Sequence, residues 1–122
     1  MIQLIEKLRV LERQIETEKG PVNLFAFLKR EDIDRWDLVI AAPWARHDYD
    51  TLGYIANALK SHLEPAEMVR LARIVILNAA EDPVRSITEN YSVEHGRVAL
   101  RDPELFNLPV THGYIITSRR AA

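Results

Sequence analysis

A polar segment at residues 46 to 50, RHDYD, carries the side chains of this chain that are best suited to chemistry. Arg46 could hold an anionic group, and the imidazole of His47 titrates near neutral pH and could exchange a proton. Asp48 and Asp50 could orient that imidazole, but both are also favourable helix N-caps, a role that stabilises a helix by about 1 kcal/mol. The sequence therefore favours a helix cap first and a ligand site second.

Two apolar runs must position this segment, WDLVIAAPW at 36 to 44 and RIVILN at 73 to 78. Each is typical of a buried strand, and more than a dozen residues separate them, which favours a parallel pair joined by a helical crossover. The carboxyl ends of parallel strands meet at one edge of a sheet, where open α/β folds bind ligands. The side chains expected in a polar pocket there are those of Trp44, Arg46, His47, Asp48, Asp50 and Asn78, with Glu81 and Asp82 beside them.

The remaining segments complete an α/β pattern. Residues 23 to 30 read as a strand that pairs with 36 to 44 in an antiparallel hairpin through a charged turn at 31 to 34. Helices are expected at 1 to 18, from Asp48 or Asp50 to 63, from 64 to about 72, and from Asp82 to about 91. Two further strands, 96 to 100 and 110 to 118, are joined by a turn-rich segment at 101 to 109. The pattern predicts a single α/β domain over residues 1 to 122, a mixed sheet of about five strands flanked by helices.

The first helix is amphipathic, and its apolar positions allow two interpretations. Leu4, Leu8, Leu11 and Ile15 repeat at spacings of three and four, and Gly20-Pro21 ends the helix. This stripe could pack on the protein's own sheet. It could also form a seam with a second copy, although two heptads are short for a coiled coil.

Two other places carry polar side chains. Glu94 and His95 are adjacent, so on a strand they would point to opposite faces, and the following Gly96 favours a helix-to-strand connector over a metal site. His112 and Tyr114 share one face of the last strand and could form a contact patch for a partner. If that face is covered, they belong to the core.

The residue patterns that several common binding and catalytic sites require are absent from the sequence. The four glycines are scattered, which argues against phosphate-binding loops, and no histidine pair stands four residues apart as a zinc-hydrolase helix requires. No cysteine is present, so disulfides and thiolate metal sites are excluded. No cofactor and no resident metal are predicted. The spacing that comes nearest to a metal-binding motif is His47-x-x-Asp50. Glu81 could be a third ligand of such a site.

Composition is ordinary for a globular protein. The 122 residues are 48% hydrophobic and 28% charged, and 16 basic against 18 acidic residues give a formal net charge of −2. The charges are interspersed, so nucleic acid is an unfavoured partner and an anionic membrane is not expected. Charges at Glu6, Lys7 and Arg9 interrupt the apolar N-terminus, and a cytoplasmic location is the default expectation.

These patterns support two hypotheses of function. The first hypothesis is a small regulatory or protein-interaction module without catalytic activity, whose partner is another protein or a second copy of the chain. The alternative is a small enzyme or ligand-binding domain that uses the polar pocket at the carboxyl ends of 36 to 44 and 73 to 78. Whether the protein is an enzyme stays open on sequence alone.

Overall fold

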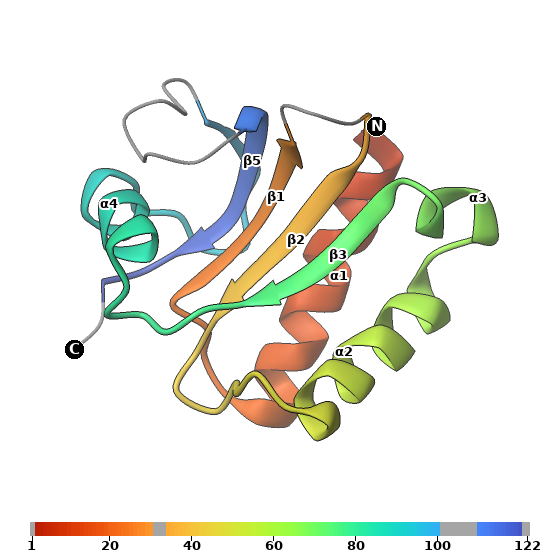
Figure 1. Cartoon of the computed structure of the whole chain (residues 1–122), viewed down its shortest axis with the longest axis horizontal. Coiled ribbons are helices and arrows are strands. Elements are labelled where there is room, and N and C mark those ends of the chain that lie inside the picture. Colours follow the sequence, from red (N-terminus) through yellow and green to blue (C-terminus); the bar gives the residue numbers. More distant parts are fainter. Residues whose placement is uncertain (1, 31–33, 101–109, 121–122) are drawn as a thin grey trace.

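A computed structural model of the chain describes residues 2 to 30, 34 to 100 and 110 to 120, and it has the predicted α/β architecture (Figure 1). In chain order the elements are α1 (Ile2–Lys19), β1 (Leu24–Arg30), β2 (Trp36–Ala41), α2 (Tyr49–His62), α3 (Pro65–Met68), β3 (Leu71–Ile76), α4 (Asp82–Asn90), β4 (Val98–Ala99) and β5 (Val110–Ser118). None of these helices is both long and apolar enough to cross a membrane.

The strands form one mixed sheet in the order β3-β2-β1-β5-β4. β1 pairs antiparallel with β2, as the hairpin prediction required, and β3 pairs parallel with β2 after the crossover through α2 and α3. The last pairings, β1 with β5 and β5 with β4, are antiparallel. The mixed sheet with one parallel pair confirms the predicted fold class.

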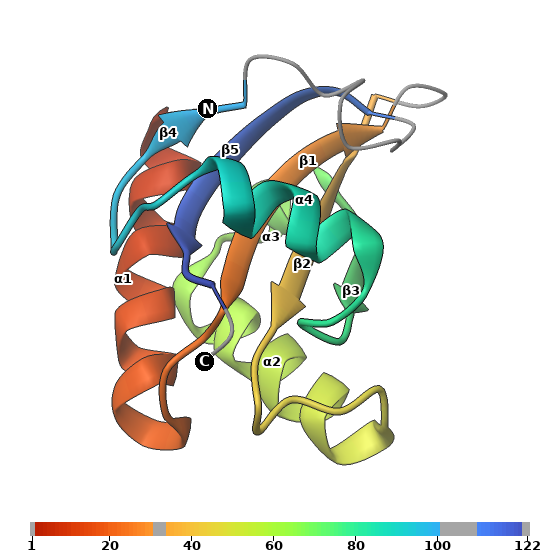
Figure 2. The ribbon, with the colours of Figure 1, turned by 90° about the vertical axis from the view of Figure 1, so that its left-hand side faces the viewer.

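Helices cover both faces of the sheet (Figure 2). α1 and α2 pack on one face, over a core that includes Phe25, Phe27 and Ile40. α4 packs on the other face through Val84 and Ile87. Because both faces are covered, all six residues of β2 are buried, which explains the nearly continuous apolar run that predicted a central strand.

The apolar stripe of α1 belongs to the protein's own core. Leu4 is 2% exposed, and Leu8, Leu11 and Ile15 are fully buried against the sheet and α2. These side chains are therefore not exposed for the seam with a second copy that the sequence left open. The same face also holds Glu12, a fully buried carboxylate.

Some predicted boundaries were wrong. β2 ends at Ala41 rather than at 44, because Pro43 and Trp44 form a turn. The third helix ends at Met68 and β3 begins at Leu71, two residues before the predicted strand, because the backbone of Arg70 already bonds to the amide of Trp36 at the start of β2. Residues 31 to 33 of the predicted turn and the predicted segment 101 to 109 lie outside the described residues.

Truncation of a core leucine in α1 tests this packing. We expect Leu11→Ala to lower the free energy of unfolding by about 2 to 5 kcal/mol, because it leaves a cavity under the sheet. Val10→Ala is the matched control, since Val10 is 60% exposed on the same helix and should change stability by less than about 0.5 kcal/mol. Chemical denaturation followed by circular dichroism measures both. Equal effects of the two substitutions would contradict the orientation of α1.

Replacement of glycine by alanine should have opposite effects on stability at two positions of the fold. A Cβ atom at Gly113 in β5 would lie 2.7 Å from Cδ2 of Leu28 and 3.1 Å from Cβ of Leu100, whereas a Cβ at Gly53 in α2 meets nothing within 4 Å. We expect Gly113→Ala to destabilise the fold by about 1 to 3 kcal/mol. Gly53→Ala should stabilise it by about 0.5 to 1 kcal/mol, because alanine has the higher helix propensity. Thermal unfolding of the two variants separates these outcomes, and a stabilising Gly113→Ala would show that the sheet is less closely packed there.

Candidate functional site

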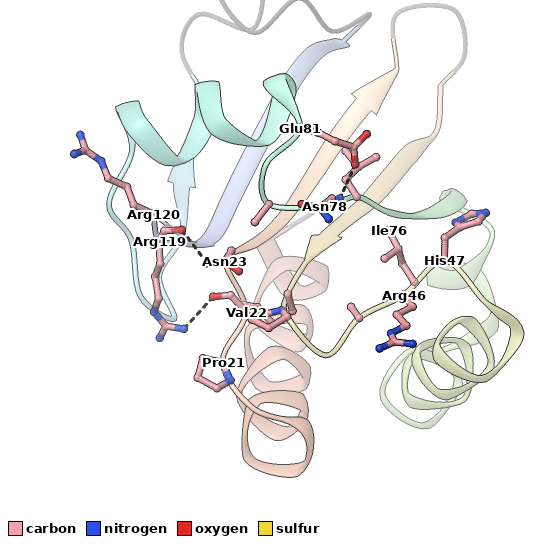
Figure 3. Close-up of a pocket in the computed structure, with 15 residues that line it drawn as sticks. Pro21, Val22, Asn23, Arg46, His47, Ile76, Asn78, Glu81, Arg119 and Arg120 are labelled. Carbon is pink, nitrogen blue, oxygen red and sulfur yellow. Dashed lines mark hydrogen bonds between the residues drawn. The ribbon is translucent and has the colours of Figure 1, made fainter. Parts of the chain in front are cut away.

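An open cleft lies at the sheet edge where the parallel strands β2 and β3 both end (Figure 3). The loop from β2 to α2 and the loop from β3 to α4 form two of its walls, as the sequence predicted. The segment before β1 and the residues after β5 form the others. The cleft has a volume of about 790 Å³, within the range of small-molecule sites.

The cleft combines an apolar floor with charged walls. Its lining residues are Pro21, Val22, Asn23, Ala42, Pro43, Ala45, Arg46, His47, Ile76, Leu77, Asn78, Ala79, Glu81, Arg119 and Arg120. Three of the six predicted ligand-binding residues, Arg46, His47 and Asn78, are among them. The other three, Trp44, Asp48 and Asp50, are not.

Trp44 and Asp48 hold the loop in place instead. The indole N–H of Trp44 donates to the carbonyl of Gly20 at 2.9 Å, which ties the loop to the end of α1. Gly20 has a φ of 115°, a conformation that suits glycine at a helix C-terminus. The carboxylate of Asp48 accepts the backbone N–H of Thr51 and caps α2. The cap interpretation of Asp48 is therefore confirmed, and Asp50 lies exposed in the first turn of the same helix.

Arg46 and His47 line the cleft from adjacent positions of one loop. Both are exposed, and their side chains extend in different directions from the loop (Figure 3). Asp48, the nearest carboxylate in sequence, bonds to its own helix. This arrangement provides a cation and an imidazole at the cleft wall, but it does not assemble the carboxylate-oriented histidine that the enzymatic interpretation required.

The opposite loop is held by its own polar groups. The side-chain oxygen of Asn78 accepts the N–H of Ala80 at 2.8 Å, and the carboxylate of Glu81 accepts the N–H of Asn78. Glu81 is the N-cap residue of α4, which begins at Asp82 as the sequence predicted. Asp82 is the first residue of α4 and does not line the cleft.

The arginines after β5 were missed by the sequence analysis. Arg119 donates to both carboxylate oxygens of Glu16, to Glu94 and to the carbonyl of Val22. Partial burial acts to lower the pKa of Arg119, but its bonds to Glu16 and Glu94 outweigh burial and raise the pKa. Arg120 is exposed and donates to the main-chain carbonyl of Glu89. Their only sequence signal was a basic pair at the end of a strand.

The remaining predicted residues lie elsewhere. The ring of Tyr114 is 6.0 Å from the ring of Trp36, at the margin of the core under α1, and His112 is exposed on β5. The candidate metal set of His47, Asp50 and Glu81 does not form a cluster. Within residues 2 to 30, 34 to 100 and 110 to 120, one group of three metal-ligating side chains comes together, and it consists of Glu12, Glu16 and His95.

Comparisons with known proteins do not assign the chain. No protein-family model, no curated protein and no solved structure matches it. The chemistry of the cleft therefore carries the functional argument.

The cap at Asp48 predicts a pH-dependent effect. The bonds from Thr51 lower the pKa of Asp48 below its ordinary value of 3.8, so its stabilising contribution is complete above that pH and is lost as the pH falls through the lowered pKa. We expect Asp48→Ala to lower the thermal midpoint at pH 7 and to differ less from the unchanged protein at pH 2. Asp48→Asn is the control, because asparagine also caps helices and should retain most of the midpoint at both pH values. A constant difference across the pH range would contradict the cap.

Proposed function

We propose that the protein is a small ligand-binding domain that holds an anionic small molecule in the cleft at the carboxyl edge of β2 and β3. The observation that carries this proposal is the set of arginines around an apolar floor. The charged lining residues are Arg46, Arg119, Arg120 and the single acidic residue Glu81, so the lining has a formal net charge of +2 with His47 neutral, three positive minus one negative. A carboxylate or phosphate group complements such walls.

Arg46 and Arg120 supply the charge that is available to a ligand. Arg119 already bonds to Glu16 and Glu94, whereas Arg46 and Arg120 are exposed. They lie on opposite sides of the cleft in Figure 3 with their guanidinium groups directed outward, so a ligand that extends across the floor would meet them once these exposed side chains turn inward. Val22, Ile76 and Leu77 offer apolar contact for the body of that ligand.

The interaction module that the sequence ranked first has less support. Four of its six candidate residues, those of α1, are buried in the core. Tyr114 is half-buried beside Trp36, and His112 remains as the exposed member of the proposed patch. A ligand-binding cleft requires none of these six residues. For that reason we prefer the ligand-binding function to the interaction module.

Ligand screening with matched arginine variants tests the proposal. The probes are inorganic phosphate, sugar phosphates, nucleotides, and mono-, di- and tricarboxylates, added at low salt and followed by thermal shift and then by calorimetry. We expect at least one class to bind, and we expect Arg46→Ala and Arg120→Ala each to weaken it about tenfold or more, because a hydrogen bond to a charged group contributes about 1.5 to 3 kcal/mol.

Arg13→Ala is the control, since Arg13 is an exposed arginine of α1 outside the cleft lining. This variant should bind like the unchanged protein. Binding that is equally weakened by all three substitutions would indicate a non-specific charge effect and contradict the proposal. The absence of binding by every probe class would contradict it as well.

A further inference from the structure

A second polar group lies beneath α1, on the side of the sheet that carries the larger core. Glu12 and Glu16 stand one helical turn apart on α1, and His95 reaches them from the connector between α4 and β4. Nδ1 of His95 lies 2.5 Å from Oε1 of Glu12, and Nε2 lies 3.9 Å from Oε1 of Glu16. One donor atom from each side chain lies within 4.8 Å of the other two.

The geometry points to a binding site for Zn²⁺ or a similar divalent transition-metal ion. Its ligands are the side chains of Glu12, Glu16 and His95. Two carboxylates and one imidazole are a donor set that Zn²⁺ and its neighbours accept. Ligand atoms about 2.1 Å from a tetrahedral ion are about 3.4 Å apart. One ligand atom of each side chain already lies within 4.8 Å of the other two, so modest side-chain rotations would bring a single ring nitrogen of His95 and two carboxylate oxygens to that spacing.

The surroundings resemble the outer shell of a metal site. The hydroxyl of Thr117 donates to Oε2 of Glu12 at 3.0 Å, and the guanidinium of Arg119 donates to both oxygens of Glu16. Such bonds fix the direction in which ligating carboxylates point, and each carboxylate oxygen keeps a further lone pair for a metal. The hydrogen bonds are therefore compatible with ligation.

Charge and access also favour a cation. Glu16 bonds to the guanidinium of Arg119, whereas Glu12 bonds to the ring of His95 and to Thr117. The two carboxylates and that guanidinium therefore carry a formal charge of −1 when His95 is neutral, one positive minus two negative. Glu12 is fully buried, where uncompensated charge is costly. The side chains of His95 and Glu16 are 30% and 22% exposed, which leaves a route for an ion from solvent.

Cobalt and zinc titrations test the site. The full chain, without an affinity tag of histidines, is dialysed against a chelator and titrated with Co²⁺ while its visible absorption is recorded, and Zn²⁺ is then added as a competitor. We expect one equivalent of Co²⁺ to bind, Zn²⁺ to displace it, and Zn²⁺ to raise the thermal midpoint. Saturation by Ca²⁺ or Mg²⁺ with no response to Co²⁺ or Zn²⁺ would overturn the proposal.

Two ligand variants and one control locate the ion. His95 has a φ of 51°, and asparagine tolerates this left-handed conformation, so His95→Asn removes the imidazole with little backbone strain. Glu16→Gln removes a carboxylate from a partly exposed position. Each should weaken Co²⁺ binding about 100-fold or more, because even residues outside the ligand set contribute 10- to 100-fold.

His47→Asn is the matched control, because His47 is exposed in the cleft and takes no part in this group. It should bind Co²⁺ like the unchanged protein, and far-UV circular dichroism confirms that each variant is folded. Binding that survives both ligand substitutions, or that is lost on His47→Asn, would overturn the assignment. The metal titration uses no anionic ligand, so failure of the metal site and failure of the function proposed for the cleft are distinguishable.

Discussion

The arrangement of this protein depends on the burial of β2 between two layers of helix. β2 pairs antiparallel with β1 on one side and parallel with β3 on the other, and its residues are inaccessible from both faces. The parallel pair brings the ends of β2 and β3 to the same edge, so the loops that follow them meet there. Apolar burial in one strand thus determines where polar side chains such as Arg46 and Asn78 gather, although these residues contribute little to the core.

A β-bulge connects the core to the polar group under α1. Ala26 of β1 lies opposite Ile115 and Phe25 lies opposite Thr117, which leaves Ile116 as an extra residue in β5. As a result Ile116 packs in the core beneath α1, and the hydroxyl of the next residue, Thr117, reaches Glu12 of the same helix. Bulges redirect side chains in this way. The bulge lets one helix bury both an apolar stripe and a satisfied carboxylate.

Most of the fold was predictable because the spacing of apolar residues along the sequence shows which side chains are buried. The continuous apolar run of β2 predicted a buried strand correctly. The helical spacing in α1 predicted an amphipathic helix correctly but left open what its apolar stripe packs against. The position of the cleft followed from the parallel pairing. The roles of single residues did not follow, because they depend on contacts distant in sequence: Trp44 bonds to Gly20, Arg119 to Glu16, and His95 to Glu12. The sequence did contain one local signal of a buried polar group in α1. Glu12 interrupts the apolar face of the helix one turn after Leu8 and one turn before Glu16.

Arg119 links the cleft to the group beneath α1. Arg119 lines the cleft, and its guanidinium bonds to Glu16, which is also a proposed ligand of a metal ion. A cation on Glu16 would draw electron density from that carboxylate and weaken its hold on Arg119, which would then be freer to bind an anion in the cleft. Because coupling between two binding equilibria is reciprocal, an anion on Arg119 would favour the cation by the same factor. The two proposed sites would therefore assist each other, through a single ion pair and without movement of the sheet.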